Sequence, residues 1–319
     1  MLHVLRKSGP VEPDIEVAAG WTLPADAVWI ELVNPTREEE LAVETAVGVE
    51  LPTRDEMAEI EASSRLYQEN GATYMIASLI CGLDDAHPVL GPVTFVLVGE
   101  RLVTIRYVHP KAFAAFKAQT ERQPEHRANG AQVLLGLLEA VVDRDADFLE
   151  HVSAKVEEIA GTIFNQPKGG AFRVILTELA KAQARNNMAR ESLVSLGRLT
   201  SFATLAPQIE QEPEGRTQLR SLQRDVQSLT EHSSYVSGNL TFLLDAALGL
   251  INIEQNEVTK IFSIAAVILL PPTLIATWYG MNFRHMPELA WPWAYPAAFV
   301  LAVASAVLPY VWIKRKGWL

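Results

Sequence analysis

Cysteine is almost absent from this sequence, which holds only Cys81 among its 319 residues. A lone thiol cannot form an internal disulfide, and it cannot supply the sets of thiolates that bind soft metals. The cysteine content therefore excludes a disulfide-stapled secreted fold and fits a reducing compartment.

Positive charge is also scarce, because acidic residues outnumber basic ones and leave a formal net charge of -11. Nucleic acids attract proteins with an excess of lysine and arginine, so no nucleic acid is expected as a partner. The sequence further lacks a nucleophile elbow, a P-loop, a Rossmann glycine set and a His/Cys metal cluster, so we do not expect an enzyme. Residues 1–7 lack the long apolar core of a signal peptide.

Charge of either sign is missing from two long apolar stretches, Ile261–Tyr279 and Trp291–Ile313. Each is about as long as the ~20 residues that a helix needs to cross a bilayer. The alternative is a pair of buried core helices, but helices of soluble proteins usually keep a polar face. Aromatic residues typical of the membrane interface flank the second stretch: Trp291, Trp293, Tyr295, Tyr310, Trp312 and Trp318. We expect a hairpin of two transmembrane helices.

The basic run Lys314–Lys316 sets the expected orientation, because basic residues stay on the cytoplasmic side. Two crossings return the chain to the side from which it started. Both termini are therefore expected in the cytoplasm, with the connection around Asn282 outside, in a protein of the cell inner membrane.

The first part of the chain mixes strand and helix patterns. The strand-like runs are Trp29–Val33, Thr73–Ile80, Val93–Val98 and Leu102–Ile105. Capping boxes predict helix starts after Thr36, with Glu39, and after Thr53, with Glu56. Gly99-Glu100 predicts a hairpin turn. The expected fold class is an α/β cytoplasmic domain followed by long helices and a two-helix C-terminal transmembrane hairpin.

Helical patterns dominate from Pro110 onward, with breaks at 166–170 and 213–215. A last helix is predicted from about Thr217, as a long stalk that continues into the first apolar stretch. The expected domains are an α/β domain at 1–125, a helical region at 126–257, membrane helices at 258–280 and 292–313 joined by a loop at 281–291, and a basic tail at 314–319.

One stripe of residues recurs at steps of three to five along this last helix, toward Asn282: Asn256, Thr259, Phe262, Ala266, Leu270, Thr273 and Thr277. Polar groups in lipid are costly unless they face protein or water, so the stripe indicates a pore built by several subunits. The alternative is that the threonine hydroxyls bond to carbonyls of their own helix. Pro271-Pro272 predicts a bend that frees nearby carbonyls, or else a simple kink for packing.

No Asp, Glu, Lys, Arg or His lies in either apolar stretch, which favours a passive channel over a proton-coupled carrier. A cation would then meet neutral oxygens such as the amide of Asn282. Such oxygens suit Mg²⁺, because this ion gives up its hydration water reluctantly and can be held through its water shell.

Two short motifs lie between the apolar stretches, Tyr279-Gly280-Met281-Asn282-Phe283 and Met286-Pro287-Glu288-Leu289. Four further segments accompany them: Phe242–Asp245, Ile251–Asn256, Leu270–Thr273 and Lys314–Leu319. Over these segments, in the last part of the chain, the sequence resembles the CorA family of magnesium channels.

The resemblance implies a funnel-shaped homopentamer for Mg²⁺ influx that also tolerates Co²⁺ and Ni²⁺. It implies that Gly280, Met281 and Asn282 form the selectivity filter, that Asn256 and Thr273 form polar pore rings, and that Phe262 and Leu270 form a hydrophobic constriction. Glu288 is the one acidic residue of the outer loop, where Arg284 stands in place of the acidic residue of many family members.

The resemblance also implies gating by intracellular Mg²⁺ bound between subunits. No motif places the ligands, and the candidates are Asp84, Asp85, Asp225 and Glu231, for which a solvated surface charge is the alternative. Two other functions stay open. A ZntB-type zinc transporter would carry a different residue at the position of Met281, and a membrane-anchored sensor or scaffold would need no polar stripe.

Overall fold

The computed structural model describes residues 1–8, 12–17, 21–59, 61–82, 88–165, 171–282 and 286–317. Its contacts divide the chain into two compact units, unit 1 (Met1–Leu244) and unit 2 (Asp245–Leu319). The predicted domain boundaries stay predictions, and each unit is described by itself.

Unit 1 is built on a seven-stranded sheet in the order β2-β1-β3-β7-β6-β5-β4, as far as the described residues show. The strands are β1 (Leu2–Arg6), β2 (Glu12–Ile15), β3 (Ala27–Val33), β4 (Leu66–Glu69), β5 (Ala72–Cys81), β6 (Val89–Val98) and β7 (Arg101–Arg106). Neighbouring strands pair antiparallel, except that β3 and β7 run parallel. The four predicted strands are confirmed as β3, β5, β6 and β7.

The predicted turn at Gly99-Glu100 is also confirmed, since it joins β6 to β7 with Val98 paired to Arg101. Gly99 has a φ of 55°, in the left-handed region that glycine adopts without a steric cost. Two-residue hairpin loops favour this conformation because it matches the twist of the flanking strands.

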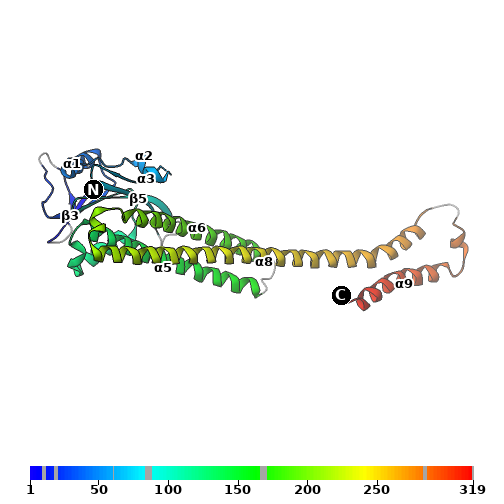
Figure 1. Ribbon diagram of the computed structural model, residues 1–319. Helices are drawn as coiled ribbons and strands as arrows, with labels where there is room; N and C mark the ends of the chain where they lie inside the picture. The colour runs from blue at the N-terminus through cyan, green and yellow to red at the C-terminus, as the bar shows by residue number, and fades with distance from the viewer. Residues whose placement is uncertain are drawn as a thin grey trace. The chain divides into compact units, whose positions relative to one another are not determined.

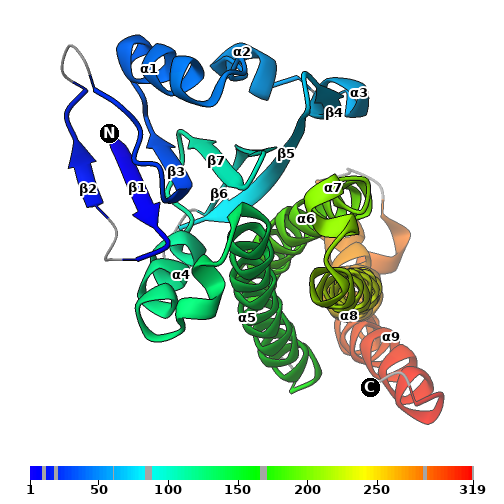
Figure 2. The same ribbon diagram turned by 60° about the vertical axis from the view of Figure 1, so that its left-hand side comes forward.

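Helices cover both faces of the sheet, α1 to α3 on one side and α4 to α6 on the other (Figure 2). The helices that begin in unit 1 are α1 (Arg37–Val47), α2 (Arg54–Met57), α3 (Ala62–Arg65), α4 (Lys111–Arg122), α5 (Gly130–Phe164), α6 (Ala171–Ala203), α7 (Pro207–Glu210) and α8 (Pro213–Tyr279), with a 3-10 turn η1 (Pro124–Arg127).

The two predicted capping boxes start α1 and α2. The Thr36 hydroxyl accepts a hydrogen bond from the Glu39 amide, and the Glu39 carboxylate accepts one from the Thr36 amide at 2.8 Å. Thr53 and Glu56 repeat this arrangement, with the return bond at 2.7 Å. Each box satisfies backbone donors that a helix start leaves without partners.

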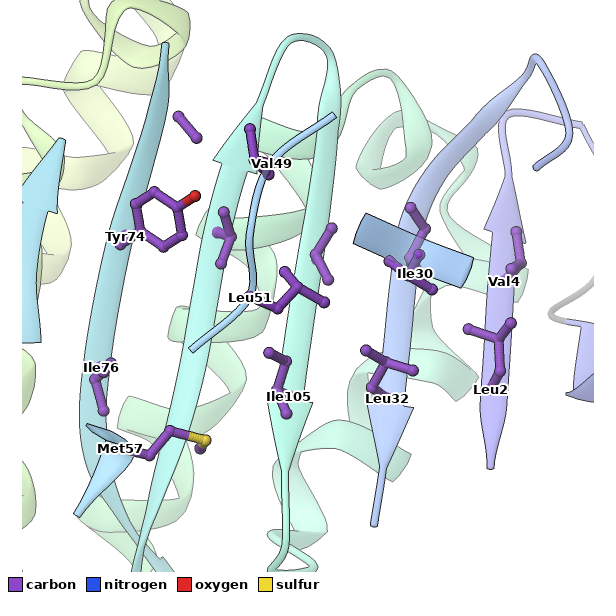
Figure 3. Packing of buried hydrophobic residues seen from close by; sticks show 14 of the residues in the cluster. Leu2, Val4, Ile30, Leu32, Val49, Leu51, Met57, Tyr74, Ile76 and Ile105 are labelled. Carbon is purple, nitrogen blue, oxygen red and sulfur yellow. The ribbon is translucent and has the colours of Figure 1, made fainter. Parts of the chain in front are cut away.

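The sheet has an apolar core on each face. On the first face, strand residues such as Ile30, Ile76 and Ile105 pack under Leu51 and Met57 (Figure 3). On the second face, Trp29 lies against Phe113 and Phe116 of α4, with ring centroids 6.1 and 5.8 Å apart. β3 is buried along its whole length because it contributes to both cores.

Buried polar contacts link α5, α6 and the first part of α8. The Ser192 hydroxyl of α6 donates to the Asp145 carboxyl of α5 at 2.7 Å. The Asn186 amide of α6 donates to the Ser233 carbonyl of α8 at 3.0 Å. Because a buried polar group without a partner is costly, these pairs favour one register of the three helices.

The start of α8 corrects one prediction. The helix begins at Pro213, whereas the sequence pattern placed a break at 213–215 and a start near Thr217. Proline suits the first turn of a helix, because the N–H that it lacks would have no partner there.

Unit 2 contains the rest of α8, a 3-10 turn η2 (Pro287–Ala290) and α9 (Ala294–Arg315), which ends two residues beyond its predicted end. Both helices are long and apolar enough to cross a membrane, and almost none of their apolar stretches is buried in the chain. Pro271 and Pro272 lie inside α8, and the ribbon of this helix changes direction in its orange part (Figure 1). These two residues cannot donate to the carbonyls of Val267 and Ile268.

Candidate functional site

The predicted filter residues stand where α8 ends. The Gly280 amide donates to the carbonyls of Ala276 at 2.9 Å and Thr277 at 3.2 Å, which closes the last turn. A Cβ on residue 280 would lie 3.1 Å from the Ala276 oxygen, so the turn favours glycine. Asn282 follows two residues later and is exposed in the single chain.

The carboxyl end of a helix is a favourable place for a cation. The aligned peptide dipoles place about half a negative charge at this end. The carbonyls of Ala276 and Thr277 accept from the Gly280 amide, and each carbonyl oxygen keeps a lone pair that can face a further donor or a cation. The side chain of Asn282 adds an amide oxygen close to this end in sequence. The arrangement supplies several neutral oxygen acceptors and no cationic donor among the described residues of the turn.

The predicted pore stripe lies on one helix, because α8 is continuous through all of its positions. From Asn256 to Thr277 its steps average roughly 3.5 residues, close to the 3.6 of an α-helix, so the side chains share one face. All stripe residues are exposed in the single chain, with Phe262 at 72% and Leu270 at 65%. Most neighbouring residues of α8 are exposed as well, so exposure alone does not select the stripe.

The threonines of the stripe bond to their own helix. The hydroxyls of Thr259, Thr273 and Thr277 donate to the carbonyls four residues earlier, at 2.9, 2.6 and 2.7 Å. These bonds confirm the alternative interpretation of the threonines, that their hydroxyls bond to carbonyls of their own helix. They do not remove the polar face, because a hydroxyl that donates its proton keeps lone pairs that can accept hydrogen bonds from water.

The outer loop is described in part. Glu288 lies in η2, is exposed, and its carbonyl accepts a hydrogen bond from the Trp291 amide at 3.2 Å. Arg284, which departs from the family pattern, lies outside the described residues.

The four candidate sensor acids do not form a site in the single chain. Asp84 and Asp85 lie outside the described residues. Asp225 and Glu231 are exposed on α8, and Glu231 accepts a hydrogen bond from Gln227 at 3.1 Å. In the part of the chain that the structure describes, no three His, Cys, Asp or Glu side chains meet in an arrangement that could hold a metal ion.

An acidic patch around Asp143, which includes Asp225, was not predicted. Burial raises the pKa of Asp143 on α5, and the negative charges of Glu139, Asp147 and Asp225 raise it further. Three of these acids recur every four residues on α5, a spacing that could have placed them on one helix face. The sequence holds no comparable signal that α8 brings Asp225 to that face.

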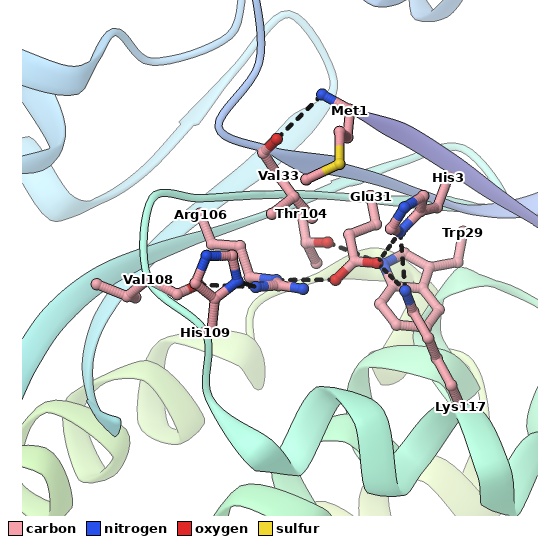
Figure 4. Close-up of polar contacts among 10 residues, drawn as sticks. All are labelled: Met1, His3, Trp29, Glu31, Val33, Thr104, Arg106, Val108, His109 and Lys117. Atoms are coloured by element: carbon pink, nitrogen blue, oxygen red, sulfur yellow. Dashed lines mark hydrogen bonds and ion pairs between the residues drawn. The ribbon is translucent and has the colours of Figure 1, made fainter. Parts of the chain in front are cut away.

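A buried ionic cluster surrounds Glu31 on β3, which is 1% exposed (Figure 4). Its carboxylate accepts a hydrogen bond from Arg106 Nε at 2.8 Å, contacts Lys117 Nζ, and lies 2.9 Å from His3 Nδ1. Burial alone would raise the pKa of Glu31, but the contact with His3 and the positive charges of Arg106 and Lys117 outweigh it and lower the pKa to about 2. With cations as partners, this carboxylate serves as a buried salt bridge rather than a metal ligand.

Comparison with known proteins adds independent evidence on the family of this chain. The family model described as "CorA-like Mg2+ transporter protein" matches residues 24–315. The magnesium transport protein CorA of Salmonella typhimurium is 34% identical over 295 residues, which are 92% of this chain and 92% of that protein.

Two solved structures share the fold. The CorA magnesium transporter from Methanocaldococcus jannaschii matches with a TM-score of 0.79 and 19% identity, over 100% of this chain and 99% of that one. The cytoplasmic domain of ZntB from Vibrio parahaemolyticus matches with a TM-score of 0.59 and 13% identity, over 79% of this chain and 98% of that one. The predicted fold class, an α/β part followed by long helices and two apolar helices, is confirmed.

Proposed function

Because the chain belongs to the family of CorA-like Mg²⁺ transporter proteins, we propose that it is a divalent-cation channel that admits Mg²⁺ into the cell. The name of this family describes transport and not catalysis, so we do not propose an enzyme. The 34% identity to a magnesium transport protein favours Mg²⁺ over the zinc alternative, since the likeness to ZntB concerns the fold alone.

One observation carries the proposal: Asn282 follows the carboxyl end of α8, the same helix that presents the polar stripe. Five copies of the chain around an axis would gather five such helix ends and five amide oxygens, with Gly280 and Met281, into a selectivity filter. A ring of neutral oxygens can hold a hydrated Mg²⁺ through its water shell, without removing the waters.

The rest of the stripe fits the wall of the same homopentameric pore. Asn256, Thr259, Thr273 and Thr277 offer acceptors to water, and Ala266 leaves room. Phe262 and Leu270 would form an apolar constriction of the kind that gates by excluding water. Co²⁺ and Ni²⁺, which resemble Mg²⁺ in charge, would also pass, and Glu288 would be the acid of the outer mouth.

We place the channel in the inner membrane with both termini in the cytoplasm, on the ground of the basic end of α9. Intracellular Mg²⁺ would close it by binding between subunits. Asp225 is the better supported of the described sensor candidates, because it belongs to the acidic patch around Asp143. Asp84, Asp85 and Glu231 complete the proposed set.

The test of function is ion flux into liposomes that contain the purified full chain, with a Mg²⁺-sensitive dye inside. Mg²⁺ entry driven by a negative internal potential, without a proton gradient and inhibited by high internal Mg²⁺, is the expected result. Proton-dependent flux of Zn²⁺ alone would favour the zinc transporter. No flux of any ion from an assembled oligomer at low internal Mg²⁺ would favour the anchored sensor or scaffold.

Asn282→Ala is expected to abolish Mg²⁺ flux in this assay, because it removes the amide oxygen that faces the hydrated ion. The matched control is Asn187→Ala, which removes an exposed amide from α6 in unit 1 and is expected to leave flux unchanged. Native mass spectrometry is expected to show five copies for both variants. Full flux through a well-assembled Asn282→Ala protein would end the filter assignment.

A further inference from the structure

The carboxyl end of α9 combines an apolar groove with three consecutive cations. The groove has a volume of about 630 Å³ and is lined by Leu308, Pro309, Val311, Trp312 and Arg315. Four of these residues are apolar, and Arg315 is the one cation among them. Groove and guanidinium together match an amphiphile with a negative head.

The cations at this end carry no carboxylate partner among the residues that the structure describes. Lys316 Nζ lies over the Trp312 ring at 5.6 Å, and Lys314 and Arg315 precede it directly. The sequence contains no Asp or Glu after Glu288, so no acidic side chain lies next to the run in the sequence. A charge run of this kind is usually hydrated, but this one continues an apolar helix of membrane-spanning length.

The position of the groove residues and the cations along α9 sets their expected depth in the bilayer. Leu308 to Trp312 belong to the last turns of the apolar stretch, and the cations follow within one turn. An exposed tryptophan beside lysine and arginine is typical of the boundary between acyl chains and headgroups. Trp312 is 57% exposed in the single chain.

We propose that this groove is a binding site for one anionic phospholipid of the bilayer. An acyl chain lies along Leu308, Val311 and Trp312, and the phosphate accepts hydrogen bonds from the guanidinium of Arg315. The site rests on the proposed function only in requiring α9 to span the membrane. A zwitterionic lipid fits the groove equally well but adds a cationic headgroup, so the discrimination lies in the charge.

Arginine suits this role better than lysine would. Its planar guanidinium can donate two parallel hydrogen bonds to one phosphate, whereas an ammonium acts as a point charge. Basic groups at the membrane surface attract anionic lipid by roughly fivefold each. Lys314 and Lys316 add to this attraction without lining the groove.

The experiment reconstitutes the full chain in vesicles that carry spin-labelled phosphatidylglycerol or spin-labelled phosphatidylcholine as probes. Electron paramagnetic resonance measures the motionally restricted fraction of each, and hence their relative association constant. We expect a marked preference for phosphatidylglycerol that saturates with its mole fraction. Arg315→Gln is expected to lower the preference by more than the roughly fivefold that one surface charge contributes, and Arg315→Lys by less.

Lys314→Gln is the matched control, since it removes the same charge from the adjacent residue outside the groove. A clearly smaller loss than in Arg315→Gln supports the site. Equal losses would mean diffuse attraction of lipid to the basic end and would overturn it. Val311→Trp, which fills the groove and keeps every charge, is expected to lower the preference, and an unchanged preference would also overturn the site.

The same vesicles separate this proposal from the proposed function. If phosphatidylcholine shows a restricted shell and Mg²⁺ flux is present but phosphatidylglycerol has no advantage, the lipid site fails while the channel stands. If neither lipid is restricted, α9 does not face the bilayer and the site fails with the membrane placement.

Discussion

Glu31 illustrates how much of unit 1 depends on one buried charge. Two cations, Arg106 and Lys117, and the ring of His3 converge on its carboxylate. Removing one partner of a buried ionic group leaves the others uncompensated, which typically costs about 3–5 kcal/mol.

Glu31→Gln is therefore expected to destabilise the chain by roughly 3 kcal/mol or more at neutral pH. The loss of stability is measured by thermal unfolding of the detergent-solubilised chain, monitored by near-ultraviolet circular dichroism. Glu121→Gln, an exposed change on α4, is the control and is expected to have little effect. Because the folded pKa is lowered from 4.5 to about 2, the stabilisation is complete above the unfolded pKa and is lost as the pH falls toward 2. A difference between wild type and variant that did not shrink over this range would contradict the assignment.

Asp145 presents the opposite case, since burial raises its pKa from 3.8 to about 7 although Ser192 donates a hydrogen bond to it. The unfolded carboxyl ionises near pH 4 and the folded one near pH 7, so this group lowers stability progressively between these values. Asp145→Asn keeps an oxygen acceptor for Ser192 and cannot ionise.

Wild type is expected to lose stability relative to the Asn variant as the pH rises from about 4 to about 7. Above pH 7 the difference in the free energy of unfolding is expected to stay constant. At roughly 1.4 kcal/mol for each pKa unit, the loss is at most about 4 kcal/mol. Unfolding at a series of pH values checks it, with the exposed Asp147→Asn as control. A stability difference that is independent of pH would show that Asp145 does not titrate in this range.

At the scale of elements, the approach of α5 to the β6–β7 hairpin depends on Gly130. A Cβ there would lie 2.3 Å from the backbone carbon of Arg101, and the Gly130 amide donates to the Glu100 carbonyl at 2.7 Å. Backbone cannot yield as a flexible side chain can, so the start of α5 must shift if any other residue is placed there.

Gly130→Ala is expected to destabilise the chain by about 1–3 kcal/mol, as overpacking does. Gly161→Ala on the same helix is the matched control, because a Cβ there meets nothing within 4 Å. It is expected to be neutral or to stabilise by up to about 1 kcal/mol through helix propensity. Thermal unfolding of both variants provides the measurement, and similar effects of the two changes would refute the steric argument.

Elements with a strong local signal were predictable from the sequence. Apolar β-branched runs predicted the four central strands, and the pairs Thr36/Glu39 and Thr53/Glu56 predicted the starts of α1 and α2. The strands β1, β2 and β4 were missed. β2 and β4 are four-residue edge strands, and β1 mixes His3 and Arg6 with apolar residues, so each depends on its partner strand rather than on its own pattern.

The candidate site also has one part with a local sequence signal, the stripe with its motif, and one part that depends on distant contacts, the acidic patch. The stripe and the Gly280-Met281-Asn282 motif lie along one helix and its end, so counting residues was sufficient to group them. The patch that joins Asp225 to Asp143 depends on α8 packing beside α5, about 80 residues away in the chain. The resemblance to the family is confirmed, whereas the roles of individual site residues stay predictions.

For the whole molecule, the lone cysteine makes the proposed membrane topology testable. Cys81 is 4% exposed, and burial raises the pKa of its thiol to about 11, although Arg106 opposes the shift. Little thiolate exists at neutral pH, so wild-type protein is expected to react poorly with maleimides. A cysteine introduced elsewhere then reports its own side of the membrane.

In right-side-out vesicles, a membrane-impermeant maleimide is expected to label Pro287→Cys and not Lys316→Cys. In inverted vesicles the result is expected to reverse, because the basic end of α9 is placed in the cytoplasm. Labelling is read from the mass shift of the purified chain, with wild type as the background control. Reaction of both variants from the same side would contradict a two-helix hairpin.

The self-bonded threonines of α8 also bear on which sign of charge the proposed pore admits. Thr273 and Thr277 have given their hydroxyl protons to the helix, so each can only accept hydrogen bonds from the water beside it. Those water molecules turn their hydrogens to the wall and their oxygens to the axis. A water column polarised in this direction solvates a cation and disfavours chloride, so this uncharged part of the wall can exclude anions without a carboxylate.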